Sequence, residues 1–131
     1  FHDVYRLDLA SGKRELVLKN DRWAGFLADW DLNVRFGFRQ TPAGGAAIDR
    51  NAADGKAEQF DEFGTDDAFT TGPLGITADG RTLYVRDSRG RDTSGLFALD
   101  LATGKPMPIG GTLKRVALHH HLHRIAHSFL F

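Results

Sequence analysis

Short runs in which apolar and polar side chains alternate, separated by turns rich in glycine, dominate residues 1–111. In residues 34–39, for example, Val, Phe and Phe alternate with Arg, Gly and Arg, which is the period of a half-buried strand. The pattern predicts strands over residues 23–28, 33–40, 45–50, 56–60, 74–78, 82–87, 95–101 and 105–109. Glycine and β-forming residues interrupt every window of helical length, so no long helix is expected in this part of the chain.

A hairpin motif recurs along the chain. Residues 4–13 return as residues 96–105 with six identities in ten, both containing Leu-Asp-Leu-Ala, then Ser or Thr, then Gly-Lys. A third copy occupies residues 46–56 and has two extra residues between its aspartate and its glycine. Each copy predicts a strand, a turn and a second strand, and the copies repeat about every 42 to 50 residues.

The turn of each hairpin copy contains an aspartate and a glycine. The aspartate carboxylates can accept hydrogen bonds from the backbone amides that follow, and the glycines suit a position with positive φ. We therefore interpret these residues as turn formers rather than catalytic acids: Asp8, Gly12, Asp49, Gly55, Asp100 and Gly104.

A second strand-turn-strand unit lies between the hairpins, at residues 26–39 and again at 75–87. Together the two units give four short antiparallel strands per repeat, which is typical of a β-propeller blade. The fold expected is all-β, a partial propeller of about two and a half blades, in which residues 3–18 form the outer hairpin of a preceding blade. Residues 61–73 are interpreted as an inter-blade connection. Trp23, Trp30, Tyr84 and the ten phenylalanines are predicted to lie in the core.

The last twenty residues differ from the rest. Whereas blades are predicted over residues 1–111, residues 112–131 form a basic tail with no acidic residue and five of the six histidines. Read as a helix, this tail places His119, His123 and His127 on one face, where adjacent pairs could chelate a divalent metal. These three are weak metal candidates, because the glutamate base of a zinc protease is missing from the tail. No cofactor is expected.

Charge and composition exclude several classes of function. Lys plus Arg equals Asp plus Glu at 17 each, so neither nucleic acid nor a membrane is expected as a partner. The absence of cysteine is compatible with a cytoplasmic location, our expectation, and equally with a periplasmic one. No Gly-x-Ser-x-Gly motif or phosphate-binding glycine loop occurs. The paired carboxylates at 61–62 and 66–67 are interpreted as solvated or turn-forming. A chain that begins at Phe1 is expected to be processed or part of something longer.

Five stretches resemble the non-catalytic propeller of prolyl oligopeptidase-family serine peptidases, on the acylaminoacyl and dipeptidyl peptidase side of that family. They are residues 5–13, 67–76, 78–84, 87–93 and 99–105, and the resemblance covers about residues 1–110. It implies a propeller that caps an α/β-hydrolase domain and admits short peptides to a Ser-Asp-His triad located in that other domain. This chain would then be no enzyme on its own.

Two functions follow as hypotheses. The first is the substrate-gating propeller portion of such a peptidase, with its hydrolase domain, further blades and peptides as partners. The alternative is a stand-alone binding or assembly module that completes a ring by self-association, because blades at both ends of a partial propeller leave an apolar face open.

Overall fold

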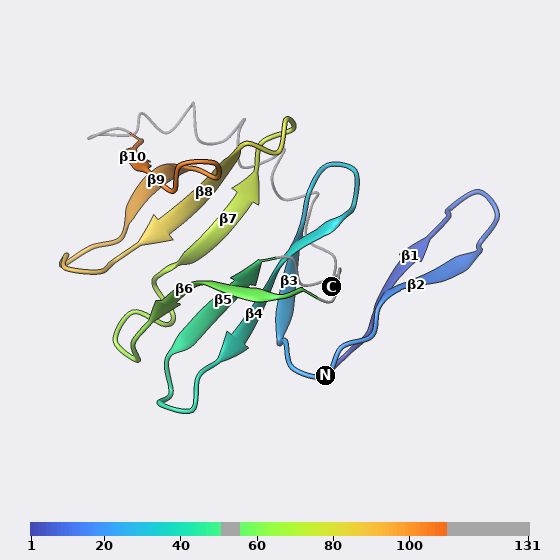
Figure 1. The fold of residues 1–131 in the computed structure, drawn as a ribbon, viewed down its shortest axis with the longest axis horizontal. Coiled ribbons are helices and arrows are strands. Elements are labelled where there is room, and N and C mark those ends of the chain that lie inside the picture. The colour runs from blue at the N-terminus through green and yellow to red at the C-terminus, as the bar shows by residue number, and fades with distance from the viewer. Residues whose placement is uncertain (51–55, 110–131) are drawn as a thin grey trace.

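The computed structural model describes residues 1–50 and 56–109 and shows ten strands in three antiparallel sheets (Figure 1). The first sheet is a hairpin of β1 (Val4–Leu7) and β2 (Arg14–Leu18). The second contains β3 (Gly25–Ala28), β4 (Val34–Gln40), β5 (Ala46–Arg50) and β6 (Glu58–Phe63). The third contains β7 (Gly72–Ile76), β8 (Thr82–Asp87), β9 (Gly95–Asp100) and β10 (Pro106–Pro108).

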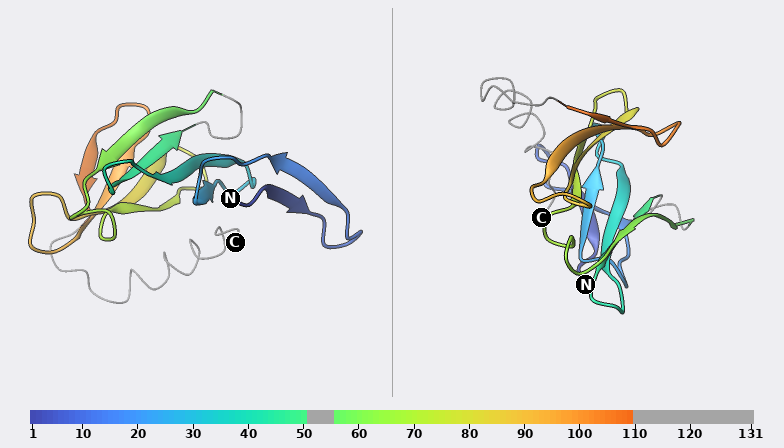
Figure 2. Two further views of the ribbon diagram at one scale, coloured as in Figure 1. Left: turned by 90° about the horizontal axis from the view of Figure 1, so that it is seen from below. Right: turned by 90° about the vertical axis from the view of Figure 1, so that its left-hand side faces the viewer.

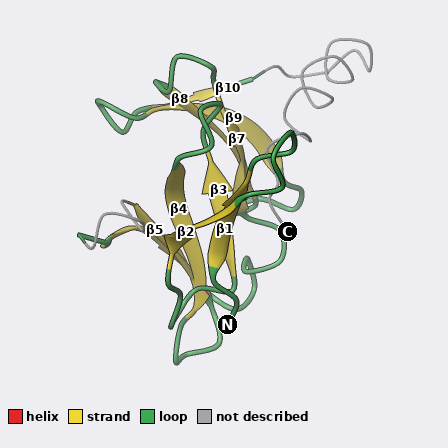
Figure 3. Ribbon diagram, turned by 90° about the vertical axis from the view of Figure 1, so that its right-hand side faces the viewer, coloured by secondary structure: helices red, strands yellow, loops and turns green. Residues whose placement is uncertain are grey.

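Each four-stranded sheet is a meander, in which every strand pairs with the next strand along the chain. The sheet β3–β6 lies between the hairpin β1–β2 on one side and the sheet β7–β10 on the other (Figure 1). This is the arrangement of neighbouring blades, so the expected all-β, partial β-propeller fold is confirmed. Strands and loops make up the whole described part (Figure 3), and it contains no helix that could cross a membrane.

The two four-stranded sheets lie against each other (Figure 2), and six buried apolar side chains form the core between them. Four come from the sheet β3–β6 and two from the sheet β7–β10: Leu27, Phe36, Ile48, Phe63, Ile76 and Leu83. Alternation along each strand directs these residues to the facing sides of the sheets. The two sheets therefore stabilise one another through a shared core, as blades do.

A smaller core joins the hairpin β1–β2 to the sheet β3–β6. Trp23 and Val34 are buried there, against Val17 and other partly buried apolar residues. The indole of Trp23 lies over Gly37 of β4, where a Cβ atom would come within 2.5 Å of Trp23 Cδ1. Glycine is therefore required at this position, because any side chain would occupy the space of the indole.

Most predicted strand ends differ from the structure by one to three residues, and two of these corrections change how the site is built. β7 begins at Gly72 rather than at residue 74, and it includes Pro73, which has no N–H to donate. This proline is tolerated because β7 is the edge strand of its sheet and is irregularly paired between Pro73 and Gly75. In addition, β6 continues to Phe63, so Asp61 and its neighbour lie in a strand and not in the connection, which spans residues 64–71.

The prediction that Trp23, Trp30, Tyr84 and the phenylalanines lie in the core is wrong for three of the described residues. Phe1 is 76% exposed, Phe69 88% and Trp30 45%. Trp30 lies in the turn between β3 and β4, and Phe69 in the connection from β6 to β7, where the alternation of a strand does not direct side chains inward. Phe129, Phe131, the predicted helix of the tail and the boundary at residue 111 lie outside the described residues.

Candidate functional site between the two sheets

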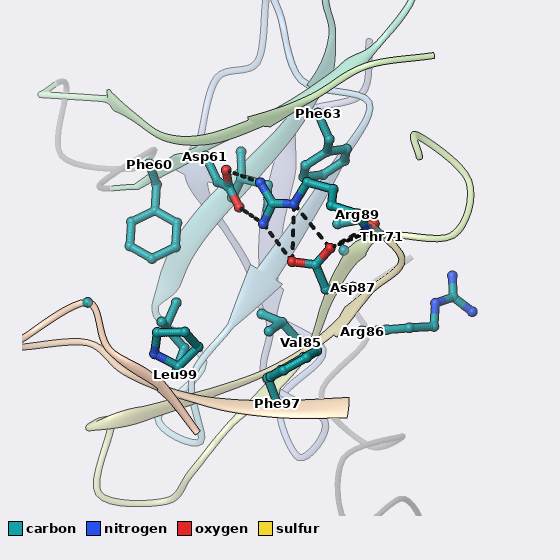
Figure 4. A pocket seen from close by; sticks show the side chains of 14 residues that line it. Phe60, Asp61, Phe63, Thr71, Val85, Arg86, Asp87, Arg89, Phe97 and Leu99 are labelled. Atoms are coloured by element: carbon teal, nitrogen blue, oxygen red, sulfur yellow. Dashed lines mark hydrogen bonds and ion pairs between the residues drawn. The ribbon is translucent and has the colours of Figure 1, made fainter. Parts of the chain in front are cut away.

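A cavity of about 340 Å³ lies between the sheets β3–β6 and β7–β10 (Figure 4). Its apolar wall contains Phe60 from β6, Val85 from β8 and Leu99 from β9. Charged side chains stand at one side of it, from β6, β8 and the loop of residues 88–94. The cavity thus joins an apolar surface to a concentrated set of charges, which makes it the candidate site in the described part of the chain.

The charged group is centred on Arg89. Its Nη1 and Nη2 donate to the two carboxylate oxygens of Asp61, at 2.9 and 3.0 Å. Its Nε lies 3.1 Å from each oxygen of Asp87, and Nη2 donates to Asp87 Oδ2 at 2.7 Å. The guanidinium also lies over the ring of Phe63, 5.9 Å from its centroid. One arginine therefore connects β6 of one sheet to the end of β8 of the other.

The electrostatics of this group favour a structural role over proton transfer. Hydrogen bonds from the Arg89 guanidinium lower the pKa of Asp87, and partial burial offsets only part of that effect. The hydrogen bonds that Arg89 donates to Asp87 and Asp61 raise the pKa of Arg89 above its ordinary value. Asp87 and Arg89 therefore both remain charged at neutral pH. A general acid or base would instead need a pKa near the working pH.

Hydroxyl groups connect the two loops beside this arginine. Ser88 donates its backbone N–H to Thr71 Oγ1 at 3.0 Å, and the two side-chain oxygens are also 3.0 Å apart. The Ser88 hydroxyl further donates to Asp67 and lies 2.7 Å from that of Thr70. The partners of the Ser88 hydroxyl are thus hydroxyl and carboxylate groups rather than an imidazole base, and these contacts fix residues 64–71 against residues 88–94.

The turn residues predicted from the repeat can be placed in two of its three copies. The Asp8 carboxylate accepts the N–H groups of the second and third residues after it, at 2.9 and 2.8 Å, and Asp100 does the same at 2.8 and 3.0 Å. Gly12 and Gly104 have φ values of +69° and +71°. Gly55, in the third copy, lies outside the described residues.

Asp49 differs from the other two aspartates. It is buried within β5, where its Oδ2 accepts hydrogen bonds from Trp23 Nε1 and Arg39 Nε, both at 2.9 Å, and its Oδ1 accepts one from Arg39 Nη2 at 3.2 Å. Burial opposes the charge, but the bonds from Arg39 and Trp23 outweigh it and lower the pKa of Asp49. Because this copy has two extra residues before its glycine, β5 continues to Arg50 and keeps Asp49 inside the sheet.

The predicted metal candidates His119, His123 and His127 lie outside the described residues. Within residues 1–50 and 56–109, no three His, Asp or Glu side chains are grouped so that they could hold a metal ion.

Sequence reasoning missed the bridge between Asp61 and Arg89. The two residues are 28 positions apart, and the carboxylate pair that contains Asp61 is interpreted from the sequence as solvated or turn-forming. No local motif joins them, because the contact exists only once the two sheets have packed against each other.

Comparison with known proteins gives one informative match. The chain is 47% identical over 122 aligned residues, 86% of its length, to dipeptidyl aminopeptidase BIII of Pseudoxanthomonas mexicana. It spans only 18% of the length of that relative. No protein-family profile and no solved structure matches the chain. The match confirms the resemblance stated from the sequence.

Proposed function

Because this chain corresponds to one segment of a prolyl oligopeptidase-family peptidase, we propose that it forms part of the non-catalytic propeller that gates access to the hydrolase domain of such an enzyme. The observation that carries this proposal is the 47% identity over 86% of the chain. The chain would contribute no reacting group. Its role would be to form part of a wall around the catalytic domain and to restrict access to short peptides.

The chemistry of the described residues supports a role without catalysis. The carboxylates of Asp61 and Asp87 are paired with Arg89, and that of Asp49 with Arg39. The sequence contains no Gly-x-Ser-x-Gly motif to supply a nucleophile. The catalytic groups would then belong to another part of the peptidase.

The contacts between the sheets support the gating part of the proposal. The buried core and the Asp61–Arg89–Asp87 bridge hold the two neighbouring blades together. A wall built from blades packed in this way stays closed between them, so a folded protein could not pass through it. Access would be limited to openings narrow enough for short peptides.

Exchange of the matching segment tests the proposal. This chain would replace its counterpart in the Pseudoxanthomonas mexicana enzyme, and hydrolysis of a dipeptidyl p-nitroanilide would be measured for the chimera, for the chain alone and for the enzyme with the segment deleted. We expect the chimera to retain activity and the other two to have none. Turnover by the chain alone, or a folded but inactive chimera, would contradict the proposal.

Gating has its own readout in the same chimera. Arg89→Ala and Asp61→Ala together remove the bridge between the sheets, whereas Arg50→Ala removes a surface ion pair within one sheet. We expect the first pair to raise cleavage of a peptide of about thirty residues relative to the dipeptidyl substrate, and Arg50→Ala to leave that ratio unchanged. An unchanged ratio in both would argue against gating by this wall.

The alternative, a module that completes a ring by self-association, is favoured by one observation. Tyr5, Leu7 and Leu16 are exposed on the hairpin β1–β2, and a cavity of about 650 Å³ opens between the base of that hairpin and the sheet β3–β6. A second copy could cover this surface. Light scattering separates the two functions: a single closed oligomer favours self-association, and a monomer contradicts it.

A further inference from the structure

A β-bulge in β6 turns two consecutive side chains toward the cavity between the sheets. Ile48 of β5 pairs with Asp61, and the next residue of β5 pairs with Gln59. Phe60 is therefore an extra residue between these two pairs. Side chains normally alternate between the two faces of a strand, but here Phe60 and Asp61 both line the cavity. Bulges that redirect a side chain in this way are common beside functional sites.

The cavity has the size and the apolar wall of a site for a small molecule. Its volume of about 340 Å³ lies within the range of about 300–1,000 Å³ that is usual for ligand sites. The ring of Phe60 and the side chains of Val85 and Leu99 stand around one part of it, and the charged groups stand at another (Figure 4). An apolar molecular body could therefore be covered here while a polar group reaches the charges.

The ring of Phe60 is an aromatic face without a cation. Phe60 is half-buried, and its ring meets that of Phe36 edge to face, with 5.3 Å between the centroids. Two other rings of the cavity each have an arginine over them, Arg89 over Phe63 and Arg91 over Phe97. None of the described arginines lies over Phe60. This ring can therefore receive the charge of a ligand.

The charged groups turned toward the cavity carry one more negative than positive charge. The carboxylates of Asp61 and Asp87 share the single guanidinium of Arg89, and each of its three nitrogens already donates to one of them. Arg86 also lines the cavity, but its side chain extends away from the others in Figure 4 and donates to Phe69 O at 3.0 Å. The side chain of Asp61 remains 32% exposed, so it can accept a further hydrogen bond. A cation suits this side of the cavity better than an anion.

We propose that the cavity binds a small primary ammonium ion with an aryl or short alkyl body. The charged nitrogen lies between the ring of Phe60 and the carboxylate of Asp61, and the apolar body contacts Val85 and Leu99. Aromatic faces attract cations through their electron-rich centre, and a carboxylate forms a charge-assisted hydrogen bond with an ammonium N–H. The bulge in β6 supplies one group of each kind from consecutive residues.

Titration of the full chain with phenethylammonium chloride, followed by amide NMR, tests the proposal. The amide of Glu62 donates to Asp61 Oδ1 at 2.8 Å, and that of Arg89 donates to Asp87 Oδ1 at 2.9 Å. These two amide resonances therefore report on the carboxylates of the cavity. We expect both to shift with the same saturable midpoint. The absence of a saturable shift at both amides would overturn the proposal.

The same spectra contain an internal control. The amides of Ala102 and Thr103 donate to the carboxylate of Asp100 at 2.8 and 3.0 Å, in an exposed turn that does not line the cavity. We expect these two resonances to stay in place. If they shift with the midpoint seen for Glu62 and Arg89, the ammonium ion binds to any carboxylate and the proposed site is wrong.

Two related probes separate the charge of the ligand from its apolar body in the unaltered chain. 2-Phenylethanol has the same body without a charge, and 3-phenylpropionate has a negative charge instead. We expect both to bind about tenfold more weakly than phenethylammonium, or more weakly still. Equal binding of 2-phenylethanol would show that the cavity selects only apolar surface and would overturn the proposal.

Two substitutions locate the ammonium group. Phe60→Leu keeps an apolar side chain without the ring, and Asp61→Asn keeps the shape without the charge. Each should weaken the binding of phenethylammonium about five- to tenfold. Glu58→Gln is the matched control, because it removes a carboxylate of the same strand that pairs with Arg50 and does not line the cavity, and it should leave the affinity unchanged.

Unchanged affinity in either variant, once its amide spectrum shows a folded chain, would overturn this placement of the ammonium group. If a variant does not fold, the three probes on the unaltered chain still decide the proposal. The titrations require neither a hydrolase domain nor turnover. Their outcome is therefore separate from that of the segment exchange that tests the proposed function.

Discussion

Arg89, in the loop after β8, donates to both carboxylate oxygens of Asp61 on β6, at 2.9 and 3.0 Å, across the boundary between two sheets. Paired two-point contacts of this kind fix both distance and orientation. The contact lies beside the apolar cavity and close to the hydroxyl contacts of the two loops. The outer strand of one blade is thereby held against the loop between the second and third strands of the next.

The pairing of Asp87 with Arg89 predicts how stability depends on pH. The pKa of Asp87 is lowered in the folded state, so its contribution is complete above the unfolded value of about 3.8 and is lost as the pH falls through the folded value. Asp87→Asn removes this contribution. Urea unfolding should therefore show a destabilised variant at pH 7 and a difference from the wild type that shrinks below about pH 4. A difference independent of pH would contradict this.

Gly37→Ala tests the packing of Trp23 against β4. The added Cβ would lie 2.5 Å from Trp23 Cδ1, and the indole cannot move freely because Asp49 holds its Nε1. Such overpacking should destabilise the chain by about 1–3 kcal/mol in urea unfolding. Gly72→Ala is the control in another strand, where a Cβ meets no atom within 4 Å, and it should change stability by less than about 0.5 kcal/mol. Equal effects of the two substitutions would contradict the packing described.

Asp49→Ala distinguishes the strand aspartate from the turn aspartates. It removes the acceptor of the Trp23 indole N–H and the carboxylate that pairs with Arg39, which keeps only Gln59 as a side-chain acceptor, and this should cost about 2–4 kcal/mol. Asp100→Ala removes bonds to two exposed turn amides, which water can replace, and its effect should be clearly smaller. Similar losses in urea unfolding would show that Asp49 also acts only on its turn.

The repeat predicted much of the fold because each hairpin is local. Turn geometry and alternation act over a few residues, so the predicted bounds of β8 agree with the structure, and the pairing of β9 with β10 follows from the turn at Asp100 and Gly104. These local rules fail where contacts between distant parts of the chain determine the role of a residue. Asp49 occupies the aspartate position of its repeat copy, yet it is bound by Trp23, 26 positions earlier, because Gly37 lies directly opposite it and leaves room for the indole to cross β4.

The candidate site could not be predicted for a related reason. The residues next to Asp61 and Arg89 in the sequence do not indicate a contact between them. Only the packing of two complete sheets brings the two side chains together. Exposure of Trp30 and Phe69 also escaped prediction, since large aromatic residues usually lie inside and nothing in a single sequence marks a turn that presents them.

A double-mutant cycle on Asp61 and Arg89 tests most directly the central claim that the two sheets pack as adjoining blades. Asp61→Asn, Arg89→Gln and the double variant would be unfolded in urea at pH 7, with Asp61→Asn and Arg50→Gln as a control cycle, because Arg50 pairs with Glu58 instead. We predict a coupling free energy of about 1 kcal/mol for Asp61 and Arg89 and additive effects in the control. Additive effects in both cycles would contradict the packing of the two sheets against each other.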